Sequence, residues 1–235
     1  MIARKLVSEA IGTALLLAAV VGSGIMGEKL AQGNIAIALL ANTIATGTAL
    51  VALILAFGPI SGAHFNPVVT LCDALLGGTS WREASAYVAA QLLGALVGVT
   101  SAHAMFGLEL FSSSEHARSG LPQLFSEFIA TFGLLAVIWG VVRSRSGVVA
   151  YAVGAYITAA YWFTASTSFA NPAVTLARAM TKTFAGIRPV DVPGFIIAQF
   201  MGGLTATLLF RWLKPNVAES APDVVAPHGP RARQA

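Results

Sequence analysis

SGAHFNPVVT at residues 61–70 and FANPAVT at residues 169–175 are the two most informative segments of this sequence. In each, an Asn-Pro pair opens a run of about ten residues, long enough for a helix that crosses only half of a bilayer. Proline fits the first position of such a helix, because its missing N–H would have no partner there. We therefore expect two half-helices, over residues 67–76 and 172–181.

The rest of the chain has the composition of a membrane protein. Of its 235 residues, 56% are hydrophobic and 10% are charged, whereas a soluble domain carries about 25% charged residues. Apolar stretches of about 20 residues match the thickness of a hydrocarbon core. They predict six spanning helices, at residues 6–26, 35–57, 82–106, 123–142, 148–166 and 192–213. We expect an all-α membrane protein with a single membrane domain over residues 1–214, followed by a disordered tail, rich in Ala and Pro, over residues 215–235.

The basic residues orient the chain. The formal charge is +4, but the charges are scattered between apolar runs, so nucleic acid is not an expected partner. Six spans put both termini on one side, and the side richer in Lys and Arg is usually cytoplasmic. The termini share their side with Arg4, Lys5, Arg82, Arg143, Arg145 and Lys214, and the other side has Lys29, Arg118, Lys182 and Arg188. We expect both termini to be cytoplasmic.

The two halves of the chain repeat each other. SEAIGTALLL at residues 8–17 corresponds to SEFIATFGLL at residues 126–135, NPVVTL from Asn66 to NPAVTL from Asn171, and AQLLGA from Ala90 to AQFMGG from Ala198. With three spans in each half, at about 6–106 and 123–213, the second half must enter the membrane from the opposite face. The repeat is therefore inverted, and the Asn-Pro ends of the half-helices should meet near the midplane.

Two helix N-termini that meet at the midplane favour uncharged solutes. Each carries roughly half a positive charge, which repels cations in low-dielectric surroundings. Irregular backbone at this depth lines a wet cavity or is buried in protein, so residues 62–65 and 167–170 should offer carbonyl oxygens, while Asn66 and Asn171 offer N–H donors. An ion would lose its hydration without enough compensating ligands. The pattern predicts passage of small neutral molecules.

Other classes of protein fit these residues less well. The four histidines form no cluster with carboxylates, and no nucleophile motif with a positioned base is found, so we expect neither an enzyme nor a metal or cofactor site. The single Cys72 fits a small buried residue. A secondary transporter with inverted repeats is the alternative from a different class, but beyond Glu9 and Glu127 we find no embedded carboxylate or His chain for an ion-coupling site.

The paired boxes in an inverted repeat resemble the aquaporin and aquaglyceroporin (major intrinsic protein) family, over nearly the whole chain up to Lys214. The resemblance implies six spanning helices, two re-entrant half-helices, a pore in every subunit and a homotetramer in membrane lipid. It places the pore midplane at Asn66, Pro67, Val68, Asn171, Pro172 and Ala173, and further pore lining at Gly62, Ala63, His64, Thr167 and Phe169. It also implies that Glu9, Glu127, Gln91 and Gln199 support the pore loops.

The chain departs from this family at the pore constriction. Most members carry Arg directly after the second Asn-Pro-Ala, but here that position is Val174. By spacing from the boxes, the other selectivity-filter residues are Thr46, Ala159 and Ser168, with Thr167 in place of Ser168 if residues 167–170 hold an insertion. Valine in place of a long charged side chain predicts a wider and less polar filter.

Arg178 follows Val174 by one helical turn on the same face. It has two interpretations: it restores positive potential at the outer mouth, or it snorkels or forms a salt bridge at the end of the half-helix. The variant box after STSFA resembles a bacterial branch linked to uncharged metalloids such as arsenous acid. We expect a broad channel in the cell (inner) membrane for metalloid hydroxides, glycerol, urea and water. A water-selective or glycerol-type pore is the alternative.

Overall fold

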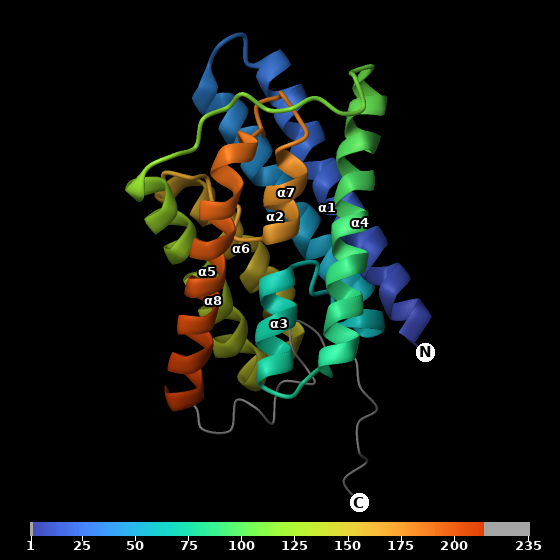
Figure 1. Cartoon of the computed structure of the whole chain (residues 1–235), viewed down its shortest axis with the longest axis vertical. Coiled ribbons are helices and arrows are strands. Elements are labelled where there is room, and N and C mark those ends of the chain that lie inside the picture. The colour runs from blue at the N-terminus through green and yellow to red at the C-terminus, as the bar shows by residue number, and fades with distance from the viewer. Residues whose placement is uncertain (1, 214–235) are drawn as a thin grey trace, which may run out of the picture.

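The computed structural model of the chain describes residues 2–213, except for the side chains of residues 143–146. The expected disordered tail at 215–235, Lys214, and the side chains of Arg143 and Arg145 lie outside this description. Long helices run roughly side by side around two short ones (Figure 1). The all-α class expected from the sequence is confirmed.

Six helices correspond to the six predicted spans. They are α1 (Ile2–Leu30), α2 (Ile35–Ser61), α4 (Trp81–Phe106), α5 (Leu121–Arg145), α6 (Val149–Phe163) and α8 (Val192–Leu213). Five are long and apolar enough to cross a membrane, whereas α6 has 15 residues, or about 22 Å of helix. The 3₁₀ turn η1 (Ser146–Val148) precedes α6. The span predicted to reach residue 166 ends earlier because Thr164 is extended and begins the second pore loop.

The two short helices are the predicted half-helices, α3 (Pro67–Leu75) and α7 (Pro172–Arg178). The side chain of Asn66 accepts the N–H of Val68, and Asn171 accepts the N–H groups of Ala173 and Val174. These caps satisfy backbone donors that have no partner inside the helix. The short helices lie at different heights between the long ones (Figure 1). A second 3₁₀ turn, η2 (Pro189–Asp191), leads into α8.

The packing of the long helices follows the inverted repeat. In the first half α1 packs against α4 and α2, in the second half α5 packs against α8 and α6, and α2 against α6 joins the halves. Small residues allow the closest approach: a Cβ at Gly94 would clash with the carbonyl oxygen of Ala10, and one at Gly202 with that of Phe128. Gly94 and Gly202 occupy equivalent places after the two Ala-Gln pairs. Gly98 lies one turn further along α4 and is equally close to the carbonyl oxygen of Ala14.

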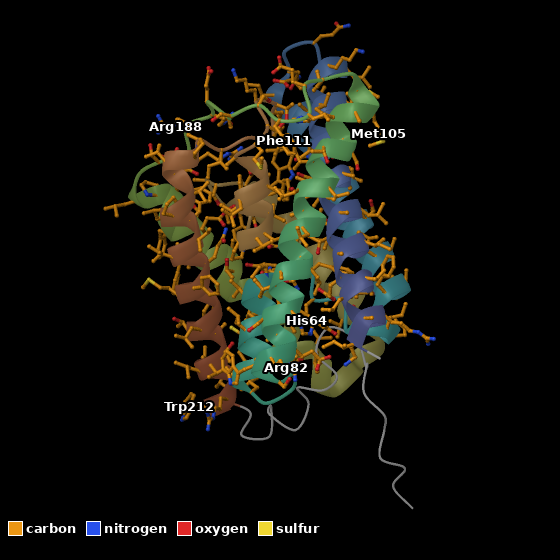
Figure 2. All side chains as sticks on the ribbon, turned by 45° about the vertical axis from the view of Figure 1, so that its right-hand side comes forward. His64, Arg82, Met105, Phe111, Arg188 and Trp212 are labelled. Carbon is orange, nitrogen blue, oxygen red and sulfur yellow. The ribbon has the colours of Figure 1, made fainter. Side chains whose placement is uncertain are left out.

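The two ends of the bundle carry different residues. Arg82 and Trp212 lie at one end, and Met105, Phe111 and Arg188 lie at the other (Figure 2). Because α1 begins and α8 ends toward the first end (Figure 1), the described chain starts and finishes on the same side. We call this the terminal end and the opposite one the loop end.

Candidate functional site

The tips of the two half-helices touch at the centre of the bundle. Asn66 Nδ2 donates to the carbonyl oxygen of Ala170 at 2.7 Å, and Asn171 Nδ2 donates to the carbonyl oxygen of Phe65 at 2.8 Å. Each asparagine therefore caps its own helix with Oδ1 and binds the opposite pore loop with Nδ2. The structure has the meeting of Asn-Pro ends that the inverted repeat predicts.

A buried carboxylate on α1 holds the first pore loop. Glu9 accepts the backbone N–H groups of His64 at 3.0 Å and Phe65 at 2.7 Å, and Nε2 of Gln91 at 2.8 Å. The hydroxyl of Ser61 donates to the same carboxylate at 2.7 Å. The group is fully buried, so these four donors replace the water that a carboxylate would otherwise need.

The second half repeats this arrangement on α5. Glu127 accepts the N–H groups of Phe169 at 2.8 Å and Ala170 at 2.9 Å, and Nε2 of Gln199 at 2.6 Å. Like Glu9 it is fully buried. All donors are neutral and none is a solute, so the geometry fits support of the loop rather than proton transfer.

Two threonines that the sequence reasoning passed over complete these networks. Thr70 Oγ1 donates to the carbonyl oxygen of Asn66 at 3.0 Å and accepts Nε2 of Gln91 at 2.9 Å. Thr175 Oγ1 donates to the carbonyl oxygen of Asn171 at 2.8 Å and accepts Nε2 of Gln199 at 2.8 Å. The available signal was the threonine shared by NPVVT and NPAVT. It links each asparagine box to the glutamine of a long helix.

The two pore loops match residue for residue. Ala63 and Phe65 in the first loop and Ser168 and Ala170 in the second have φ between 48° and 51°. Such backbone costs about 1–3 kcal/mol per non-glycine residue, and the hydrogen bonds to the buried glutamates hold it in place. The matched pattern leaves no room for an insertion in the second loop, so Ser168, not Thr167, corresponds to Ala63.

A cavity of about 620 Å³, a volume that includes some open solvent, is lined by both asparagines. One part of its wall is largely apolar and comes from residues spaced four apart on the long helices: Leu16, Val20, Thr46, Leu50, Ile54, Leu134, Ile138, Val153, Ile157 and Tyr161. The other part comes from the pore loops and half-helices: Ala63, His64, Phe65, Asn66, Val69, Ser168, Phe169, Ala170, Asn171, Val174 and Arg178. An apolar wall facing a row of polar groups suits a small solute with several hydroxyl or amide groups.

The whole chain can now be compared with known proteins. The family model described as major intrinsic protein matches residues 1–148 and 142–232. The chain belongs to the major intrinsic protein family. Members of this family are channels rather than enzymes.

Relatives in this family agree with the assignment. The chain is 53% identical over 224 residues to aquaglyceroporin AqpS of Rhizobium meliloti (strain 1021), covering 94% of this chain and 96% of the relative. It is 38% identical over 159 residues to aquaporin NIP1-1 of Oryza sativa subsp. japonica, covering 66% of this chain and 55% of the relative. The X-ray structure of the aquaglyceroporin from Plasmodium falciparum matches with a TM-score of 0.72 at 21% identity, covering 92% of this chain and 99% of the other. This last likeness shows the shared fold.

Not every expected pore residue of this family member faces the cavity. Gly62 and Thr167 do not line it, and Pro67, Val68, Pro172 and Ala173 are buried behind its wall. These residues shape the pore through the backbone. His64 lines the cavity, as the family resemblance implies, and in Figure 2 it lies in the half of the bundle nearer Arg82.

The filter position assigned to Ala159 is wrong. Ala159 is exposed on the outside of α6, and Tyr161 lines the cavity instead, with its hydroxyl donating to Thr46 Oγ1 at 3.3 Å. Tyr161 continues the four-residue spacing of Val153 and Ile157, whereas Ala159 lies about half a helical turn away. This spacing was visible in the sequence, but counting from the boxes missed it.

Arg178 also belongs to the cavity wall. It is 2% exposed, its Nε donates to the carbonyl oxygen of Ala185, and its guanidinium carbon lies 3.4 Å from the ring centre of Phe169. The interpretation as a snorkelling or salt-bridged residue at a helix end is wrong, because the guanidinium faces inward. The expectation of a weakly polar filter therefore needs correction: Val174 does line the cavity, but a charged group and Tyr161 line it too.

A second arginine lies beside Phe169. Arg118, in the segment between α4 and α5, donates to the carbonyl oxygens of Gly186 at 2.8 Å and Ser166 at 2.9 Å, and its guanidinium carbon lies 4.9 Å from the ring centre of Phe169. Burial lowers the pKa of Arg118 to about 10, against the opposing attraction of Glu127 and Tyr161, so it stays charged at neutral pH. From the sequence, Arg118 could be assigned only to the side of the membrane opposite the termini. It lies in a long connection, and no helical periodicity there indicates which way a side chain points.

Proposed function

We propose that this protein is a passive channel through which small uncharged solutes cross a bilayer, including metalloid hydroxides such as arsenous acid, glycerol, urea and water. The observation that carries the proposal is the crossed pair of asparagines inside one cavity, opposite an apolar wall. A polyhydroxylated solute can keep its carbon or metalloid side against the apolar wall while its hydroxyl groups exchange water for loop carbonyls and amides.

The charges around the cavity support passage of neutral rather than cationic solutes. Glu9 and Glu127 turn their oxygens toward backbone and glutamine N–H groups, and no carboxylate is among the described residues that line the cavity. A cation would meet Arg178 without a compensating anion. Desolvation of an uncompensated ion costs many kcal/mol, far more than desolvation of a hydroxyl group.

The size of the residue after the second Asn-Pro-Ala supports solutes larger than water. Val174 projects far less into the cavity than the arginine usual in this family. A glycerol-type pore is the second candidate, favoured by aromatic rings in the cavity wall, among them Tyr161 and Phe169 beside Val174 and Arg178. The relative from Rhizobium meliloti is named an aquaglyceroporin, which is consistent with either candidate.

We also propose a homotetramer in the bacterial inner membrane with both termini in the cytoplasm. Large apolar side chains are exposed on the long helices, for example Leu93, Ile197 and Phe125. These surfaces require lipid or other copies of the chain as neighbours. A passive pore gives flow in either direction, set by the solute gradient.

Reconstitution into liposomes tests the proposal. Swelling or uptake should be measured with arsenous acid, glycerol, urea and water, using empty liposomes for the background. We expect flux of arsenous acid and glycerol well above background, without saturation at low concentration and without dependence on an ion gradient. Water flux without flux of the other three solutes would refute the wide filter, and gradient-driven flux would favour a transporter.

A further inference from the structure

The two halves differ in charge at one equivalent position of the half-helices. Arg178 follows Asn171 by seven residues, and Asp73 follows Asn66 by seven residues. The carboxylate of Asp73 accepts the hydroxyl of Thr79 and does not line the cavity, whereas the guanidinium of Arg178 does. Asp73 therefore binds a residue of its own connection and does not contact the pore. Because the equivalent residue of the first half does not face the cavity, the repeat alone does not explain why Arg178 does.

The guanidinium of Arg178 is held in place from one side. Its Nε donates to the carbonyl oxygen of Ala185, and its plane lies against Phe169. Phe169 is in turn packed at 5.2 Å, edge to face, against Phe195. Neither terminal nitrogen of Arg178 forms a hydrogen bond to any residue of the described range 2–213. The N–H groups on these nitrogens are therefore available to molecules in the cavity.

A second polar group of the cavity also lacks a protein partner. Ser168 is 3% exposed and lines the cavity, and its Oγ has no hydrogen-bond partner among the described residues. A buried hydroxyl without a hydrogen-bond partner destabilises a fold, and a molecule in the pore that binds Ser168 Oγ would remove this cost. Ser168 and Arg178 flank Phe169 and Val174 in the second half of the pore.

We propose that Arg178 is the cationic group of the selectivity filter, replacing the arginine that Val174 displaces, and that Ser168 binds the solute beside it. This inference rests on the proposed function and assigns the residues that set its selectivity. Placing the charge one helical turn away leaves the space beside Val174 open for wider neutral solutes. At an effective dielectric constant near 20, a fixed charge about 5 Å from the path disfavours a monovalent cation by roughly 300-fold.

The main test compares cation leak through purified variants in liposomes. Arg178→Gln removes the charge, Arg178→Lys keeps it, and Arg188→Gln removes an equal charge from a residue that does not line the cavity. We expect Arg178→Gln to raise potassium and proton leak at least about tenfold, while Arg178→Lys and Arg188→Gln stay near wild type. Equal leak in Arg178→Gln and wild type, or equal leak in the Gln and Lys variants, would overturn the inference.

A rescue variant separates charge from structural support. If Arg178 acts by its charge in the cavity, Val174→Arg/Arg178→Gln should return the cation leak to within about threefold of wild type. If the double variant leaks as much as Arg178→Gln, the residue acts by bracing Ala185 and the inference fails. Thermal unfolding of each purified variant shows whether it is folded, and Arg178→Met, which also removes the charge, takes the place of Arg178→Gln in every comparison if the Gln variant is not folded.

Ser168→Ala tests the solute-binding part of the inference. The change is small and removes only the hydroxyl, so we expect arsenous acid and glycerol flux to fall at least about threefold while water flux changes little. Unchanged ratios of solute flux to water flux would remove Ser168 from the inference. Absence of all neutral-solute flux in the wild type would instead refute the proposed function, which the ratios of cation leak do not test.

Discussion

Val174 occupies the position directly after the second Asn-Pro-Ala, where the family resemblance implies arginine, and the consequence of this difference for solute flux can be measured directly. We predict that Val174→Arg, with Arg178 retained, lowers glycerol and arsenous acid flux at least about tenfold and water flux by less than about threefold. The added side chain fills the cavity beside Val174, and a narrowed pore excludes wide solutes first. Stopped-flow light scattering of proteoliposomes measures both rates. Val174→Met supplies a long uncharged control, and an equal fall in all fluxes would place Val174 away from the constriction.

Tyr161 and Ala159 form a matched pair on the two faces of α6. We predict that Tyr161→Leu raises glycerol and urea flux several-fold relative to water, because it removes the ring and the hydroxyl that reaches Thr46. Ala159→Leu should leave every flux unchanged, since Ala159 is exposed on the outside of the bundle. The same liposome assay applies. A change with Ala159→Leu but not with Tyr161→Leu would restore the filter expected from the sequence.

At the residue scale, the contacts that can be predicted from the sequence are those of residues with a counterpart in the other half or a place in a helical periodicity. Glu9 and Gln91 were found because each has a counterpart in the second half. Tyr161 was missed because its position was counted back from the second Asn-Pro box across a loop. The number of residues in that loop does not determine which face of α6 points to the pore. Arg118 had no period at all, and only tertiary contacts with Gly186 and Ser166 reveal its place.

The half-helices depend on the threonine of each box. Thr70→Val and Thr175→Val should each destabilise the protein by about 1–3 kcal/mol, because each leaves a buried glutamine N–H and an asparagine carbonyl without that partner. Both threonines bind an asparagine carbonyl and a glutamine N–H, and Thr70 Oγ1 also lies 3.2 Å from Nδ1 of His64, so the cost of Thr70→Val should equal or exceed that of Thr175→Val. Thermal unfolding in detergent measures the loss. Thr48→Val, at an exposed position of α2, is the control with the same change, and a loss in only one half would contradict an equivalent role.

Element boundaries were predictable where a cap residue marks them. Asn66 and Asn171 start α3 and α7 at the expected residues. The end of α7 was not predictable, because the helix ends at Arg178 and not at residue 181. Directly after Arg178, the N–H of Ala179 donates to the carbonyl oxygen of Leu176, and this 3₁₀-type hydrogen bond closes the last turn. Composition does not distinguish a helical residue from an apolar turn residue at this depth.

At the scale of the whole molecule, the arrangement of spans followed from the sequence because two independent constraints agreed. Bilayer thickness fixes how long a span must be, and three ordered matches between the halves fix the inversion. The hydrogen bonds from Asn66 to Ala170 and from Asn171 to Phe65 then join the halves reciprocally. Neither half can form the pore alone, because each supplies the donor that the other loop accepts.

In a membrane, one end of the bundle faces the cytoplasm and the other faces the cell exterior. If the terminal end is cytoplasmic, as the positive-inside rule favours, Gln32→Cys in the turn after α1 should react with a membrane-impermeant maleimide in intact cells. Trp81→Cys, at the start of α4, should react only after lysis. Both positions are exposed, and neither substitution changes the charge pattern. The wild type is the background control because its single Cys72 is 6% exposed. Labelling of Trp81→Cys but not Gln32→Cys in intact cells would reverse the orientation and put Arg178 on the cytoplasmic side of the pore.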